Sequence, residues 1–333
     1  MFWASPNLNF NMPSIIYWGL IMLLPLVTIQ LYFKLATRWQ ILDKHNKRSS
    51  HNYITIRGAG IIFPISFLFG TMYHYVETST INYYALISCL MVSGVSFLDD
   101  LAEVNYLKRL AIQLIAGLIM ITALDAFQYT WWMVAGLLVL LIGTLNTFNF
   151  MDGINGITGL YSLVVLFSMQ ILITDSILNW VIGAVLVFLF FNARKRAKCF
   201  SGDVGAVSLA FIICYGIGRI IIYTGHFQWI LMLAVYGIDS VITIGIRLFR
   251  KENIFQAHRL HFYQYLTNSK GLGHLTVATG YALIQVIFNL VLFLNHYSGY
   301  QYNAAVIIFF IIISMLYILI RFHFEGRSLF QTR

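Results

Sequence analysis

The sequence predicts an all-α polytopic membrane protein, a helical bundle of about eleven transmembrane helices with its N-terminus outside and its C-terminus in the cytoplasm. Three observations lead to this fold class. The 333 residues are 59% hydrophobic and only 10% charged, whereas a soluble globular chain is roughly 25% charged. Long apolar runs recur from one end of the chain to the other. Basic residues gather in every second connection between these runs.

The apolar runs define the expected membrane spans. Each is close to the length that a helix needs to cross a bilayer, and some are near the short end. The first basic residue, Lys34, follows the first run, so this run is expected to be a retained helix. No linker or repeat divides the chain, so residues 1–333 are expected to form a single integral-membrane domain. The spans cover roughly residues 14–33, 58–76, 81–98, 107–124, 130–147, 155–173, 178–192, 205–223, 227–246, 275–295 and 302–320.

The basic residues set the expected orientation. Segments 34–57, 99–109, 193–198, 247–270 and the tail after 320 hold all of the 21 Lys and Arg residues except Arg219. The alternate connections hold none. Basic loops stay in the cytoplasm, so these segments are expected on that side. The net charge of +9 therefore indicates orientation in a bilayer and not a nucleic-acid partner.

The first polar cluster lies on the basic side, where Arg48-Ser-Ser-His51 precedes Thr55-Ile-Arg57-Gly-Ala-Gly60. The two glycines would let the backbone approach another backbone or a phosphate, and Arg57 supplies positive charge. A basic loop held near anionic lipid headgroups is the commoner explanation of such a segment.

The second cluster is the pair Asp99-Asp100, directly after an apolar run. Adjacent carboxylates repel, and keeping both ionised requires a cation nearby. Magnesium with a phosphate is the usual reason. A solvated helix end explains the pair alone equally well. Arg109, on the next span, could face a phosphate.

The third cluster has a polar residue at every third position: Asn146, Asn149, Asp152 and Asn155. On a helix these side chains would share one side. A carboxylate and three amides at the mouth of a membrane helix are costly unless something polar binds there. The alternative is a polar loop between two helices.

The fourth cluster, Gly202-Asp203-Val-Gly205, opens a span after a tetrabasic run. Backbone N–H groups at a helix start attract phosphate, and a magnesium ion on Asp203 would hold the same phosphate. The Gly-Asp-x-Gly pattern is common by chance, and the tetrabasic run can be explained as a determinant of membrane orientation.

The last polar features are Asp239, inside the ninth span, and His258-Arg-Leu-His261. A carboxylate at that depth normally has a partner or faces a cavity. The two histidines are one helical turn apart and could donate hydrogen bonds to a sugar or phosphate from one face. An amphipathic helix on the bilayer surface also fits this segment.

Taken in this order, the clusters resemble the polyprenyl-phosphate N-acetylhexosamine-1-phosphate transferase family, glycosyltransferase family 4, over about residues 48–265. The His258 loop looks closest to an O-antigen-initiating branch. There are departures. Tyr53-Ile-Thr-Ile stands where the family has two prolines, Ala59 replaces a glycine, and Asn155 replaces an aspartate of many members.

The resemblance implies a role for each matching residue and a Mg²⁺ cofactor, which Mn²⁺ could replace. Catalysis falls to the paired aspartates, and Asp152 is implied both as a metal ligand and in substrate binding. The implied sets are Asp99 and Asp100 for catalysis; Asn149, Asp152, His258, Arg259, His261, Arg57 and His51 for substrate binding; and Asp203 and Asp152 for the metal.

The implied reaction transfers a sugar-1-phosphate from a UDP-N-acetylhexosamine to undecaprenyl phosphate and releases UMP. The sugar would be GlcNAc or a 6-deoxy sugar such as FucNAc or QuiNAc. The product would begin a lipid-linked glycan such as O-antigen. Direct attack is expected, with Asp99 positioning or deprotonating the lipid phosphate, and a covalent route through Asp100 is the alternative.

The implied location is the bacterial inner (cytoplasmic) membrane, with the active site on the cytoplasmic face and membrane lipid around the chain. A homodimer is compatible with the resemblance. The rival function is a cation- or proton-coupled membrane transporter, in which Asp152 and Asp239 would be intramembrane carboxylates.

Overall fold

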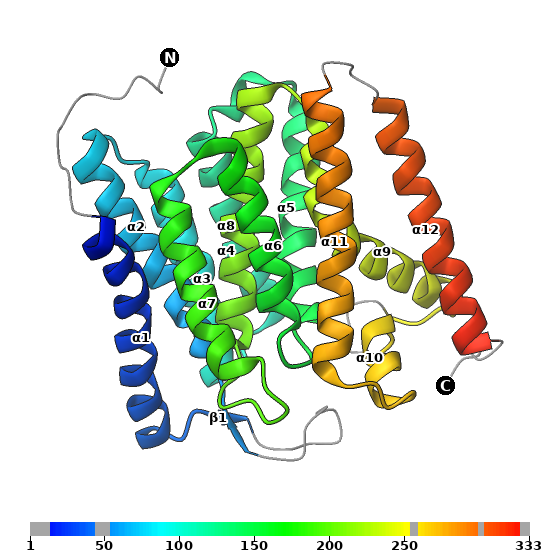
Figure 1. The fold of residues 1–333 in the computed structure, drawn as a ribbon, viewed down its shortest axis with the longest axis horizontal. Helices are drawn as coiled ribbons and strands as arrows, with labels where there is room; N and C mark the ends of the chain where they lie inside the picture. The colour runs from blue at the N-terminus through cyan, green and yellow to red at the C-terminus, as the bar shows by residue number, and fades with distance from the viewer. Residues whose placement is uncertain (1–13, 44–53, 254–258, 299–302, 327–333) are drawn as a thin grey trace.

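The computed structural model describes residues 14–43, 54–253, 259–298 and 303–326. Twelve α-helices make up most of this part of the chain, so the all-α fold class is confirmed (Figure 1). Three 3₁₀ helices join them: η1 (Ala59–Ile61), η2 (Ala126–Gln128) and η3 (Phe227–Leu233). The α-helices are α1 (Ser14–Arg38), α2 (Ile62–Thr78), α3 (Tyr83–Leu101), α4 (Tyr106–Ala123), α5 (Trp131–Met151), α6 (Ile157–Ile173), α7 (Ser176–Asn192), α8 (Gly202–Thr224), α9 (Ala234–Phe249), α10 (Phe262–Asn268), α11 (His274–Tyr297) and α12 (Asn303–Glu325).

The expected spans all correspond to helices. The spans 58–76 and 227–246 each begin in a 3₁₀ helix, η1 and η3, and continue as α2 and α9. Within the described ranges, nine helices are long and apolar enough to cross a membrane. Helices α6 and α7 are shorter, with 17 residues each, which is about the lower limit for a span. The chain is therefore a polytopic membrane protein, while the count of eleven and the orientation stay predictions.

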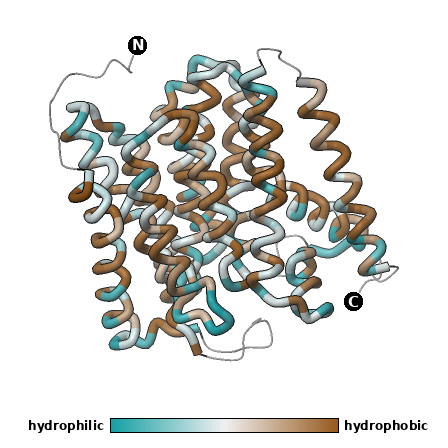
Figure 2. Tube along the Cα trace, viewed as in Figure 1, coloured by the Kyte–Doolittle hydropathy of each residue, from teal (hydrophilic) through white to brown (hydrophobic). Residues whose placement is uncertain are grey.

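Helix α8 forms the centre of the bundle. It packs against α2, α3, α5 and α6, and 72% of the residues in its apolar 18-residue stretch are buried. Small residues such as Gly205 and Ala206 let neighbouring helices approach its first turns. Helices α1 and α12 lie at the two flanks (Figure 1). Only 17% and 11% of the residues in their apolar 18-residue stretches are buried. Most of the length of each helix is apolar, and the hydrophilic residues concentrate at the ends of the bundle (Figure 2).

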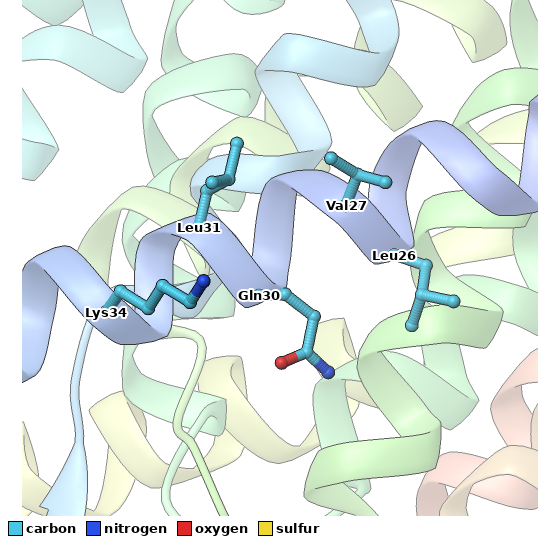
Figure 3. Close-up of a pocket in the computed structure, with 5 residues that line it drawn as sticks. All are labelled: Leu26, Val27, Gln30, Leu31 and Lys34. Carbon is cyan, nitrogen blue, oxygen red and sulfur yellow. The ribbon is translucent and has the colours of Figure 1, made fainter.

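Helix α1 carries a shallow groove lined by three apolar side chains and two polar ones, Gln30 near its middle and Lys34 at one end (Figure 3). Such a surface is expected where a helix contacts lipid chains and a basic side chain reaches the headgroups. None of the acidic residues of the predicted site lines it. The lining residues are Leu26, Val27, Gln30, Leu31 and Lys34.

One end of the bundle gathers most of the described connections that are rich in basic residues. A two-stranded antiparallel sheet lies there, formed by β1 (Leu42–Asp43) and β2 (Thr55–Ile56). Ile56 also bridges to Cys199, so the segment after β2 meets the segment before α8. Helix α10 lies near the same end (Figure 1). This meeting of distant segments positions the polar clusters. That this end faces the cytoplasm stays a prediction.

Candidate active site

The glycine patterns of the first and fourth clusters pack against each other. The backbone N–H of Ala59 donates to Phe200 O at 3.0 Å, and that of Gly60 donates to Ser201 O at 2.9 Å. A Cβ atom on Gly60 would lie 2.8 Å from Ser201 O and would overlap the Gly205 backbone. These glycines thus serve an approach of backbone to backbone, which brings Arg57 to the start of α8.

Arg57 bridges two of the predicted site aspartates. Its Nε donates to Asp100 Oδ1 at 2.6 Å, and its Nη2 donates to Asp203 Oδ1 at 3.0 Å. Its backbone oxygen accepts a 2.6 Å hydrogen bond from Tyr32 of α1. Burial alone would lower the pKa of Arg57, but the charges of Asp100 and Asp203 raise it above its usual value. Arg57 therefore stays charged and holds α3 to α8.

Asp100 caps α8 from the end of α3. Its Oδ1 accepts from the Asp203 N–H at 2.9 Å, and its Oδ2 accepts from the Val204 N–H at 3.0 Å. Its side chain is 0% exposed. The free N–H groups of a helix start favour such an anion. Gly202 has φ 71°, and a Cβ atom there would lie 2.5 Å from Asp100 Oδ2. Both carboxylate oxygens of Asp100 therefore bond to the start of α8.

Asp99 and Asp203 share a second arginine. Arg109 Nη1 donates to Asp99 Oδ2 at 2.5 Å and lies 3.4 Å from Asp203 Oδ2. Asn149 of α5 donates to the same Asp203 oxygen at 3.1 Å, and the side chains of Asp99 and Asp203 also come within hydrogen-bonding reach. We call these six residues the carboxylate cluster: Arg57, Asp99, Asp100, Arg109, Asn149 and Asp203.

Asp152 lies beside the carboxylate cluster but bonds elsewhere. Ser201 Oγ donates to its carboxylate. Burial raises the pKa of Asp152 to about 7, although the Ser201 hydrogen bond lowers it. The charges of Asp203 and Asp100 also raise this pKa, so Asp152 is near both. Its predicted roles in metal and substrate binding are untested by this geometry.

The expectation of one helical face for the third cluster is partly wrong. Helix α5 ends at Met151, so Asn146 and Asn149 lie on it, but Asp152 and Asn155 follow it. Asn155 is buried and donates to Arg194 O at 2.7 Å. It therefore holds the basic segment 193–198 against the turn between α5 and α6.

The carboxylate cluster has a donor set that suits magnesium. If all three aspartates are ionised, the two arginines leave one net negative charge, which favours a cation. Mg²⁺ commonly uses one or two carboxylates plus water and substrate phosphate, and Asp99 and Asp203 offer two that are close together. Among the described residues, no three Asp, Glu, His or Cys side chains are already gathered around one point. Metal binding remains a prediction.

The histidine loop occupies a different place. His51 and His258 lie outside the described residues. Arg259 is half-buried. The Nδ1 atom of His261 lies 2.9 Å from Asp239 Oδ1, so Asp239 has the partner that its depth required. His261 precedes α10, so the expected helix with His258 and His261 on one face is not formed in the described part.

Two contacts of the site were not predicted. Arg109, which could face a phosphate, lies between Asp99 and Asp203. Its position ten residues after Asp99, across a short connection between helices, is a signal that could have found it. Ser201 was not singled out, although it directly precedes Gly202-Asp203 and the turn carries it to Asp152.

Comparison with known proteins agrees with the expected family. A family model described as glycosyl transferase family 4 matches residues 82–224. The phospho-N-acetylmuramoyl-pentapeptide-transferase of Thermotoga petrophila is 28% identical over 232 residues, which is 61% of this chain and 72% of that protein. The matched segment 82–224 carries every member of the carboxylate cluster except Arg57. Both comparisons support the expected resemblance to glycosyltransferase family 4 and, together with the helical fold, a membrane transferase.

Proposed function

We propose that this protein transfers a sugar-1-phosphate from a UDP-N-acetylhexosamine to undecaprenyl phosphate and so begins a lipid-linked glycan. The donor sugar would be GlcNAc or a 6-deoxy sugar such as FucNAc or QuiNAc. The carboxylate cluster is the observation that carries the proposal. It joins α3, α4, α5 and α8 at the basic end of a membrane bundle, where a lipid phosphate and a soluble nucleotide could meet.

The reaction exchanges one phosphorus–oxygen bond for another. An oxygen of the lipid phosphate attacks the sugar-linked phosphorus of the donor. The bond from that phosphorus to the bridging oxygen breaks, and UMP leaves with the bond's electron pair. Both partners are anions, so the site must screen their repulsion and hold them in line. Bound magnesium would neutralise the pyrophosphate and the charge that develops on the leaving UMP.

The three aspartates divide the work. Asp99 and Asp203 have partly exposed side chains, 13% and 16%, and are the ones that a metal or phosphate could reach. Asp99 would orient the lipid phosphate or accept its proton. Asp100 is fully buried and already accepts from two backbone N–H groups and Arg57. This arrangement favours direct attack over a covalent route through Asp100.

The remaining cluster residues bind and orient. Arg57 and Arg109 carry fixed positive charge between the carboxylates, where they could hold the oxygens of a bound phosphate. Asn149 fixes one oxygen of Asp203. Asp152 and Arg259 would contact the nucleotide and the sugar, and His261 lies in the same loop as Arg259. Manganese would serve in the same positions as magnesium.

The transporter alternative requires a carboxylate that can exchange its ion. Asp239 instead accepts from His261, Thr243 and Tyr281 at 2.9, 3.2 and 2.5 Å. A buried acid with so many donors is held in a fixed structure. The described geometry therefore gives the transferase more support.

The test is UMP release by membranes that contain the protein, undecaprenyl phosphate and Mg²⁺. The donor panel should hold UDP-GlcNAc, the UDP forms of FucNAc and QuiNAc, and UDP-N-acetylmuramoyl-pentapeptide, because the relative's name points to that last sugar. We expect one N-acetylhexosamine donor to be used, and only with lipid and metal present. Release from the pentapeptide donor alone would overturn the sugar assignment, and release from none would overturn the transferase proposal.

A further inference from the structure

Asp239 is a fully buried acid on α9 that the proposed reaction does not use. Its carboxylate oxygens accept from Thr243 Oγ1 at 3.2 Å, from Tyr281 OH at 2.5 Å and from the Phe262 N–H at 3.4 Å. His261 Nδ1 lies 2.9 Å away and must carry the proton there, because a carboxylate only accepts. A buried carboxylate is costly without such partners, so these bonds fix the start of α10 against α9 and α11.

The same loop is held from its other side by α12. Arg321 donates to Leu260 O, and its Nη1 donates to Thr243 Oγ1 at 2.8 Å. Its Nε donates to Glu325 Oε1 at 2.7 Å, which balances its charge. The backbone just before His261 is therefore anchored by a helix that otherwise lies at the flank of the bundle.

Tyr263 connects the anchored loop to the candidate active site. Tyr263 OH donates to Phe150 O at 2.8 Å at the end of α5. A Cβ atom on Gly153 would lie 2.3 Å from the Tyr263 hydroxyl oxygen, so the hydroxyl end of this side chain packs closely against the residue that follows Asp152. Asp152 in turn accepts from Ser201, two residues before Asp203. A continuous set of contacts thus leads from Asp239 to the carboxylate cluster.

We propose that Asp239 is a positioning residue: through His261 and Tyr263 it holds the turn at Asp152 in place and thereby sets the affinity for the nucleotide-sugar donor. This inference rests on the proposed function. It assigns His261 a positioning role in place of direct contact with the substrate. Arg321 completes the support, so α12 contributes to donor binding from a distance.

The first test is Asp239→Asn. The amide is neutral and has a single acceptor oxygen, so either the bonds at the Oδ1 position or the Tyr281 bond at the Oδ2 position must be lost, and the bonds that remain no longer end on a charged group. We expect KM for the UDP-sugar to rise about tenfold, the size of a lost hydrogen bond to a charged group, with kcat changed less than about threefold. Hydrogen exchange in residues 259–268 should speed up. An unchanged KM, or a fall in kcat alone, would overturn the proposal.

The second test separates positioning from substrate contact. In His261→Asn the amide nitrogen replaces Nδ1 and can still donate to Asp239, whereas in His261→Gln it replaces Nε2 and cannot. If His261 acts through Asp239, His261→Asn should keep KM within about threefold of wild type and His261→Gln should raise it about tenfold. Equal damage from both variants would show that the imidazole itself is needed and would overturn the positioning role.

Asp175→Asn is the matched control. Asp175 is also a buried acid with a basic partner, Arg219, and it caps α7. We expect this variant to lower stability and leave KM unchanged, so a similar rise in KM would assign the effect of Asp239→Asn to general loosening. The exchange measurement needs no substrate. A wild-type protein that releases no UMP would refute the proposed function, while exchange in 259–268 would still test the anchor.

Discussion

The carboxylate cluster and the group around Asp239 both pair acids with arginine, yet they differ in access. We call the latter the Asp239 group: Asp239, Thr243, His261, Tyr281, Arg321 and Glu325. In the cluster, the side chains of Asp99, Asp203 and Arg57 are 13%, 16% and 36% exposed. In the Asp239 group, the side chains of Asp239, His261 and Arg321 are only 0%, 3% and 1% exposed. The cluster has three carboxylates for two arginines. In the Asp239 group, the donors that Asp239 accepts from are themselves buried.

This difference in exposure distinguishes a group of acids that can bind a ligand from a group that only supports the fold. A buried charge is expensive in either place, so burial alone does not identify a catalytic group. A buried carboxylate that already accepts hydrogen bonds from several protein groups has no acceptor position left for a ligand. Acids that keep partial exposure and excess charge can bind a cation and, through it, a phosphate. On this criterion we propose that Asp99 and Asp203 take part in the chemistry and that Asp239 supports the structure around them.

The largest expected effect is that of Asp203→Asn. Removing one charge from the open cluster should lower kcat for UMP release by about 10²–10³-fold, because the metal and the phosphate lose their ligand. The protein should insert normally, and its melting temperature in detergent should change little, since the substitution also removes repulsion. Near wild-type transfer by this variant, together with a collapse of kcat in Asp239→Asn, would reverse the roles of the two groups.

The next effect separates the paired aspartates. Asp100→Asn turns an amide group toward the backbone donors of α8, which should cost about 1–3 kcal/mol of stability and abolish most turnover while UDP-sugar still binds. Asp99→Asn should lose about 10²-fold in kcat with little change in stability.

Thermal unfolding, UMP release and calorimetric binding of the UDP-sugar would measure these effects. Equal stability of the two variants would contradict the capping role of Asp100. A phosphorylated aspartate found after incubation with donor but without lipid would instead support the covalent route.

Much of the fold could be predicted from the sequence because hydropathy is local. All eleven apolar runs became helices within a few residues of their expected ends. The main errors fall where a polar residue still continues a helix, as at Asn149, or where packing converts a span start into a 3₁₀ turn, as at η3. Neither effect leaves a mark on a hydropathy pattern.

The acids of the site were predictable, but their partners were not. Asp99, Asp100 and Asp203 stand out because carboxylates at the ends of apolar runs are costly. The sequence does not show that Arg57 joins Asp100 to Asp203, or that Asp239 binds His261, which is 22 residues away. Tertiary packing decides these pairs, and spacing along the chain carries no trace of them.

A smaller effect concerns the backbone contact that builds the carboxylate cluster. Gly60→Ala adds a Cβ atom against the Gly205 backbone, and we expect a loss of about 1–3 kcal/mol from overpacking. Gly94→Ala on α3 is the control, because a Cβ atom there meets nothing within 4 Å. Its unfolding free energy should change by less than about 1 kcal/mol. If Gly60→Ala leaves the unfolding free energy unchanged, the segments at Gly60 and Gly205 can separate, and the carboxylate cluster is then not a fixed structure.

The smallest expected effect compares two tyrosines of α10 that both donate to a backbone carbonyl. Tyr263 OH bonds Phe150 O at 2.8 Å beside the turn at Asp152, whereas Tyr265 OH bonds Phe324 O at 2.6 Å on an exposed side. Each Tyr→Phe variant removes one neutral hydrogen bond, worth about 0.5–1.5 kcal/mol. Tyr263→Phe should raise KM for the donor about threefold to tenfold, because its loss releases the turn. Tyr265→Phe should leave KM within about twofold, since water can replace its bond to α12. If the two variants change KM equally, the support from the Asp239 group reaches the active site by a path other than Tyr263.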